Sequence, residues 1–160
     1  MTTLVPPAMA VVLLTAMLSA QQAAPPWQAP APTPGALVAQ TTGYKQDAVE
    51  FTLAPGEGME YKYRLEKGAG MLYSWTASGL LHYEMHSVPD GAPKEFAETF
   101  DKQDDRMSDH GTYTAPFPGI HGWYWQNKTG QPVTFKMTTT GFYSESQEFR
   151  KGQPVRRKPF

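Results

Sequence analysis

Apolar and polar residues alternate with a period of two through most of the chain after residue 46. The clearest stretch is residues 59–65, where Met59, Tyr61, Tyr63 and Leu65 alternate with charged side chains. Such alternation is typical of a β-strand with one face in a core and the other in water. Glycine, proline and asparagine turn signals separate this stretch from further strands expected at residues 49–53, 71–77, 80–87, 111–115, 122–126, 133–139 and 142–149.

Two regions interrupt this alternation. Ser78-Gly79 predicts a break that divides residues 71–87 into two strands. The polar, acidic stretch 95–109 predicts a loop, in which Phe96 and Phe100 at helical spacing allow at most a short turn of helix. Its carboxylates do not follow the ordered spacing of a calcium loop, so a solvated acidic loop is the preferred interpretation.

The spacing of the strands predicts an all-β fold. About eight short strands with turns between them, each half polar, are typical of a single antiparallel two-sheet β-sandwich of the jelly-roll type. Residues 46–149 are enough for one modest core and too few for two. We therefore expect one β-sandwich domain over residues 46–149.

The N-terminal segment differs sharply from this domain, because every Lys, Arg, Asp and Glu lies at or after Lys45. Residues 8–20 form an uninterrupted, mostly apolar run with the length of a signal-peptide core. Counted from Leu4, the run reaches the lower limit for a membrane-spanning helix. Residues 1–20 are thus predicted to form an apolar helix, either a cleaved signal peptide or an N-terminal anchor in the inner membrane, which places the β domain in the periplasm.

Two further segments flank the β domain. Residues 21–45 are rich in proline, alanine and glutamine, which predicts a disordered linker because such a sequence buries too little apolar surface to fold alone. Residues 150–160 form a basic tail with five Lys and Arg residues and no acid. A solvated, frayed tail is the default interpretation, and contact with anionic lipid headgroups is the alternative.

Composition and motifs exclude several function classes. The net charge of −1 provides no basic face for nucleic acid. The absence of cysteine excludes thiol catalysis, disulfides and thiolate metal sites. No nucleophile elbow, phosphate-binding glycine loop, dinucleotide fingerprint or zinc-protease motif occurs, so we expect no enzyme and no cofactor. The 15 acidic residues leave a hydrolase as a third functional class. Their spacing in the sequence does not identify a catalytic acid/base pair of carboxylates.

The four histidines are weak candidates for a metal site. His82 and His86 share one face of a predicted strand, but their Cα atoms would lie about 13 Å apart at the rise of a strand. A shared ion would therefore need a partner from elsewhere, such as His110 or His121. The alternative is that His82 is solvated and that His86 anchors the following loop by hydrogen bonds.

Residues 121–127, His-Gly-Trp-Tyr-Trp-Gln-Asn, form the densest aromatic feature of the chain. Trp123 and Trp125 share one strand face, which favours a central core strand. An exposed aromatic platform for a sugar ring is the alternative, and it requires one Trp in water. Asn127 begins both a glycosylation sequon and a hairpin turn. The candidate ligand or interaction residues are therefore His86, His121, Trp123, Trp125 and Asn127.

Several of these motifs together resemble a family of bacterial envelope proteins usually labelled transmembrane anchor proteins. The motifs are Pro-Gly-Glu-Gly-Met-Glu at 55–60, Tyr-Ser-Trp at 73–75, His86 with Pro93, and residues 121–127 followed by Thr134 and Gly141. The resemblance implies an N-terminal membrane segment, a variable spacer and an exported β domain. The C-terminal strand pattern is also similar to the sandwich domains of Golgi-dynamics proteins, which are interaction modules.

The expected function is that of a non-catalytic, exported or membrane-anchored envelope module that binds a protein partner or scaffolds an assembly. Its membrane contact would be residues 4–20 if these are not cleaved. The rival hypothesis is a periplasmic domain that binds a small ligand or a metal ion through His86, His121 and the Trp123/Trp125 pair. The burial of Trp123 and Trp125 distinguishes these two hypotheses, because tryptophans in the core cannot form a binding platform.

Overall fold

The computed structural model describes residue 35 and residues 37–160. The predicted signal peptide or anchor over residues 4–20, and most of the predicted linker over residues 21–45, lie outside this range. Within it, no helix has the length and apolar character needed to cross a membrane.

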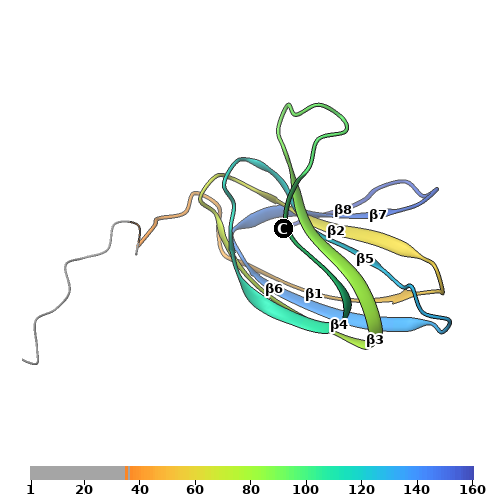
Figure 1. The fold of residues 1–160 in the computed structure, drawn as a ribbon. Helices are drawn as coiled ribbons and strands as arrows, with labels where there is room; N and C mark the ends of the chain where they lie inside the picture. Colours follow the sequence, from red (N-terminus) through yellow and green to blue (C-terminus); the bar gives the residue numbers. More distant parts are fainter. Residues whose placement is uncertain (1–34, 36) are drawn as a thin grey trace, which may run out of the picture. The chain divides into compact units, whose positions relative to one another are not determined.

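The β domain consists of antiparallel strands that hydrogen bonds join into one sheet, and this confirms the all-β prediction (Figure 1). The order across the sheet is β1-β6-β3-β5-β2-β7-β8, and β4 pairs with β3. The strands are β1 (Lys45–Leu53), β2 (Gly58–Leu65), β3 (Gly70–Pro89), β4 (Glu98–Thr114), β5 (Gly119–Gln126), β6 (Val133–Gly141), β7 (Tyr143–Arg150) and β8 (Arg156–Pro159).

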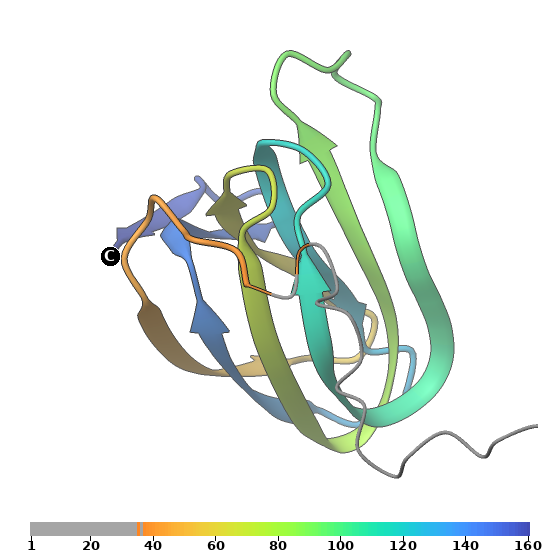
Figure 2. The ribbon, with the colours of Figure 1, turned by 90° about the vertical axis from the view of Figure 1, so that its left-hand side faces the viewer.

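The long strand β3 divides the sheet into two arms. Its residues 71–77 pair with β6, whereas residues 82–89 pair with β5. We call β1, β6 and the first half of β3 the first arm, and the second half of β3 with β5, β2, β7 and β8 the second arm. The sheet curls so that the arms face each other (Figure 2). Ring contacts bridge them, at 5.2 Å between Phe51 and Tyr61 and 4.7 Å between Trp125 and Phe135.

The predicted break at Ser78-Gly79 is wrong, because β3 continues through it. These residues instead mark the point where β3 leaves β6 and where its register with β4 shifts. A Cβ atom at position 79 would lie 2.9 Å from the Val133 side chain. The glycine therefore permits a close approach at the bend of a continuous strand.

The predicted acidic loop is also wrong, because most of it belongs to the 17-residue strand β4. β4 has β3 as its strand partner and lies at an edge, so most of its side chains are exposed and show no apolar period. Asp105 adopts a positive φ of 57° near the register shift between β3 and β4. The short turn of helix allowed near Phe96 is absent, and the residues before β4 form an irregular turn.

The basic tail forms a strand where a frayed end was expected. Arg156–Pro159 pairs with β7, and its cations contact carboxylates of neighbouring strands. Arg157 lies 2.7 Å from Glu145, and Lys158 lies 2.7 Å from Asp47. These ion pairs and the ladder hydrogen bonds hold β8 at the edge of the second arm.

The core lies between the two arms and is strongly aromatic. Alternate residues of β6 and β2 face inward, as the period of two predicts. A polar network crosses this core, in which Thr139 Oγ1 lies 3.0 Å from Tyr63 Oη and 3.1 Å from Tyr143 Oη. The largest fully buried side chains are Trp75, Trp123, Trp125, Tyr63, Tyr83, Tyr143 and Phe135.

Candidate functional site

Trp123 and Trp125 both face the core, and each is 0% exposed. Their rings stack with a centroid distance of 6.2 Å, and Trp125 also meets Trp75 edge-on at 6.1 Å. This burial confirms the core interpretation of the strand. The alternative of an exposed tryptophan platform is wrong, because no ring face reaches solvent.

His121 lies on the same inward face of β5 and is fully buried. Its Nδ1 atom is 2.8 Å from the Tyr113 hydroxyl, and the Phe117 ring packs beside it at 5.2 Å. Burial lowers the pKa of His121 from 6.5 to about 4. The imidazole is therefore neutral at pH 7, and its full burial makes it part of the core.

His86 points to the opposite face of the second arm, so the fold separates it from His121. Its Cα atom pairs in register with Gly122, whereas His121 pairs with Ser87. Burial and the positive charge of Lys62 lower the pKa of His86. The predicted pairing of His86 with His121 around a ligand is therefore wrong.

The remaining histidines do not complete a metal site. His82 Nδ1 lies 2.8 Å from Asp104 Oδ1, so the prediction of a freely solvated His82 is wrong. His110 is exposed on β4 and pairs in register with Ser74, far along β3 from His82. Among residues 37–160, no group of three His, Cys, Asp or Glu side chains is placed to hold a metal ion.

Asn127 is a structural anchor at the end of β5. Its side-chain amide donates hydrogen bonds to the carbonyl oxygens of Leu53 (3.0 Å) and Gln131 (2.8 Å). Its Oδ1 accepts hydrogen bonds from the backbone N–H and the hydroxyl of Thr129. Because the side chain is fully buried and its polar atoms are bonded, the structure supports the hairpin interpretation over the glycosylation sequon and the ligand role.

The outward face of the second arm carries a network of ion pairs. Lys62 Nζ lies 2.6 Å from Glu60, and Lys102 lies 2.9 Å from Glu84. Lys62 is buried although it points outward, because its stem packs against the bare backbone of Gly122 on the neighbouring strand. His86 sits between the two carboxylates, at 3.9 Å from Glu60 and 3.7 Å from Glu84.

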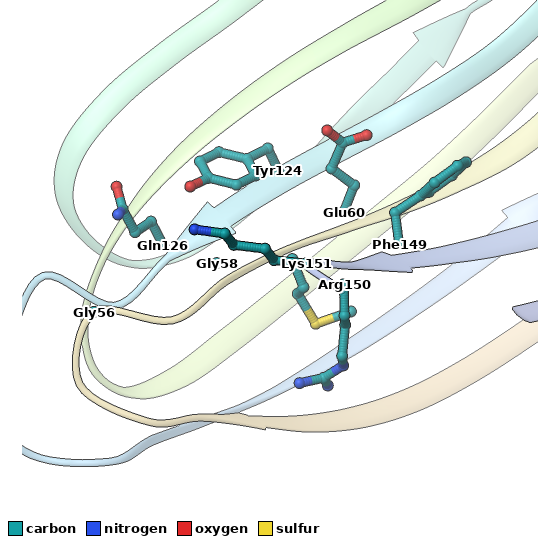
Figure 3. A pocket seen from close by; sticks show the side chains of 9 residues that line it. Gly56, Gly58, Glu60, Tyr124, Gln126, Phe149, Arg150 and Lys151 are labelled. Carbon is teal, nitrogen blue, oxygen red and sulfur yellow. The ribbon is translucent and has the colours of Figure 1, made fainter. Parts of the chain in front are cut away.

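A groove of about 490 Å³ opens beside this network (Figure 3). It was not predicted, because its residues come from strands far apart in the chain. Two features of the sequence point to the groove. They are Gly58 at the start of a strand and Tyr124 between two core tryptophans. The lining residues are Gly56, Gly58, Met59, Glu60, Tyr124, Gln126, Phe149, Arg150 and Lys151.

The hairpin between β3 and β4 is the second feature that sequence reasoning missed. It projects beyond the rest of the β domain in both ribbon views (Figures 1 and 2). Phe96 is 47% exposed and Phe100 is 41% exposed on this hairpin. Their spacing in the sequence allowed a short turn of helix, but only the fold shows that they lie on a projecting hairpin.

No protein-family model matches the chain, and no curated protein matches it. Among solved structures, the chain is similar to PliG of Aeromonas hydrophila, a periplasmic inhibitor of g-type lysozyme. The two share 14% sequence identity with a TM-score of 0.38, and the alignment covers 66% of this chain and 91% of PliG. The chain is also similar to a cupin-superfamily sugar phosphate isomerase from Silicibacter pomeroyi, at 13% identity and a TM-score of 0.34, covering 72% and 67%. These values are too low to assign a family, an activity or a partner.

Proposed function

We propose that this protein is a non-catalytic module of the bacterial cell envelope that binds a protein partner through the β3–β4 hairpin. The two arms act as the two layers of a β-sandwich that presents this hairpin. Residues 4–20 direct the domain to the periplasm, either as a cleaved signal or as an anchor in the inner membrane. The spacer that follows gives the domain reach from the membrane surface.

The exposure of Phe96 and Phe100 on the projecting hairpin is the observation that carries this proposal. Large aromatic side chains gain most free energy when a partner buries them, and they are enriched among residues that dominate protein interfaces. A narrow projection fits a concave surface on the partner. We therefore expect a partner with an apolar pocket that receives Phe96.

Contacts at the base of the hairpin support a preformed binding element. Asp90 forms a two-pronged ion pair with Arg64 of β2, and its backbone N–H donates a hydrogen bond to Pro118 O at 3.0 Å. The Phe100 ring meets the Tyr113 ring edge-on at 5.4 Å. A hairpin that is already ordered loses less conformational entropy on binding than a mobile loop does.

Site-specific crosslinking in cells tests the partner. A photoreactive phenylalanine analogue replaces Phe96 in the full chain, and the control carries it at Leu72, which is 58% exposed on the first arm. We expect one discrete crosslinked product from position 96 and none from position 72. Equal labelling at both positions, or no product from position 96, contradicts the proposed role of the hairpin.

Topology is tested separately. A reporter that is active only outside the cytoplasm is fused after Phe160, and we expect activity that deletion of residues 4–20 abolishes. The mass of the mature protein then distinguishes a cleaved signal from an anchor. A fusion that is active only with a cytoplasmic reporter contradicts export.

A further inference from the structure

We propose that the groove on the outward face of the second arm binds an acidic saccharide, a sugar that carries a carboxylate. This site is separate from the hairpin and does not depend on the proposed protein partner. Its residues come from β2, β5 and β7 and the turns beside them. The groove volume of about 490 Å³ lies within the range of small-molecule sites, about 300–1,000 Å³.

Tyr124 provides a flat stacking surface in this groove. A Cβ atom at position 58 would lie 2.5 Å from the hydroxyl oxygen of Tyr124 and 2.9 Å from its Cε2 and Cζ atoms, so the phenol end of the ring lies against the backbone of Gly58. The side chain is half-buried, and its ring lines the groove (Figure 3). The C–H face of a sugar ring is apolar and suits such an aromatic surface.

Polar groups surround this ring from several directions. In Figure 3 the Gln126 amide and the Lys151 ammonium lie near the phenol end of Tyr124, and the Glu60 carboxylate and the Phe149 ring lie at the opposite end. An amide and a carboxylate both bind vicinal hydroxyl groups, because together they offer donors and acceptors. An aromatic floor with a polar rim is complementary to a sugar, which has hydroxyl groups at its edges and C–H groups on its face.

The charge balance of the groove favours an anionic ligand. Glu60 is neutralised by Lys62 at 2.6 Å. Arg150 extends to the other side of its strand, where it lies 2.7 Å from both Glu57 and Glu148. Lys151 forms no ion pair with any residue in the range 37–160. One uncompensated positive charge therefore faces the groove, and a carboxylate is its natural partner.

Titration of the full chain with defined oligosaccharides tests this inference. The probes are trisaccharides of galacturonic acid and of mannuronic acid, and their neutral counterparts are trisaccharides of galactose and of mannose. We expect saturable binding of at least one acidic trisaccharide. Calorimetry measures this binding, and so do shifts of the backbone amide resonances of β2, β5 and β7. Its neutral counterpart should bind about fivefold more weakly, as expected for one exposed charge pair.

Substitutions assign the roles of the two main residues. Tyr124→Ala should weaken binding of the acidic trisaccharide about tenfold, because stacking is lost. Lys151→Gln should reduce that affinity to the level of the neutral sugar. Tyr44→Ala is the matched control, since Tyr44 is an exposed tyrosine outside the groove. An unchanged thermal midpoint shows that each variant is folded.

Three results would overturn the inference. The first is the absence of saturable binding by either acidic trisaccharide at millimolar concentration. The second is equal affinity of Tyr124→Ala and the unmodified protein, which would place the ligand elsewhere. The third is an unchanged preference for the acidic sugar in Lys151→Gln, which would remove the role of the free ammonium group.

Discussion

Lys158 Nζ lies 2.7 Å from the Oδ1 atom of Asp47, although the two residues are 111 positions apart in the chain. The pair joins β8, at one end of the second arm, to β1, at the end of the first. The other oxygen of Asp47 accepts hydrogen bonds from the hydroxyl groups of Tyr61 (2.8 Å) and Tyr63 (3.1 Å). A buried carboxylate thus links both arms along the side where the curled sheet closes.

Replacement of Asp47 should destabilise the domain strongly. Asp47→Ala leaves two buried tyrosine hydroxyls without their acceptor, and we expect a loss of about 3 kcal/mol in the free energy of unfolding. Glu50→Ala is the control on the same strand, where the carboxylate pairs with Lys136 in solvent. It should cost less than about 0.5 kcal/mol. Urea denaturation measures both, and equal losses would contradict the role of Asp47.

The contribution of Lys158 should depend on Asp47. Lys158→Met should cost about 1 kcal/mol in the unmodified chain, because a half-exposed cation is removed from a buried anion. The same substitution should cost almost nothing in the Asp47→Ala background. A double-mutant cycle measures the difference, and strictly additive losses would show that the two residues do not interact.

Gly122 should not tolerate even a methyl group. A Cβ atom there would lie 2.7 Å from the Lys62 Cα atom on the adjacent strand. We expect Gly122→Ala to lower the free energy of unfolding by about 3 kcal/mol, since backbone must move. Gly130→Ala is the control, because a Cβ atom at that position meets nothing within 4 Å. Thermal denaturation compares them, and similar midpoints would contradict the close approach of β2 and β5.

Asn127 should contribute to stability and not to binding. Asn127→Ala removes hydrogen bonds to Leu53 O, Gln131 O and Thr129, and should cost about 3 kcal/mol. Gln131→Ala is the control, because it keeps the backbone carbonyl that Asn127 uses. It should cost less than about 0.5 kcal/mol. If Asn127→Ala were equally mild, the buried network would not stabilise the hairpin.

Stability should fall as the pH is lowered from 7 to 5, in part because of His121. Its pKa is about 4 in the folded protein and near 6.5 when exposed, so the unfolded chain binds more protons below pH 6.5. The stabilisation is present above pH 6.5 and is lost as the pH falls toward 4. We expect His121 to account for about 2 kcal/mol between pH 7 and pH 5.

The variant His121→Gln provides the test, because glutamine does not titrate in this range. The difference between its unfolding free energies at pH 7 and pH 5 should be about 2 kcal/mol smaller than that of the unmodified protein. His110→Gln removes an exposed histidine and is the control for the loss of one imidazole. An equal pH dependence in all three proteins would mean that His121 is not a buried, neutral histidine.

Strands with one face in the core were predictable from the sequence, because their alternation is visible in consecutive residues. The strands β2 and β6 lie within two residues of the predicted ranges 59–65 and 133–139. The end of β4 coincides with the predicted strand 111–115, but the rest of β4 was missed because an edge strand with mostly exposed side chains carries no apolar period. The bend of β3 was predicted as a break, since glycine marks both features in a sequence.

The sequence alone determined that Trp123 and Trp125 share one face and that Tyr124 takes the other, because successive strand residues alternate. Only the tertiary structure decided which face turns inward. That choice depends on the pairing of β5 with β2 and β3, and pairing register is set by the free energy of the whole sheet. The same pairing places Tyr124 over Gly58 and buries His121, so the groove and the loss of the predicted histidine site have one physical cause.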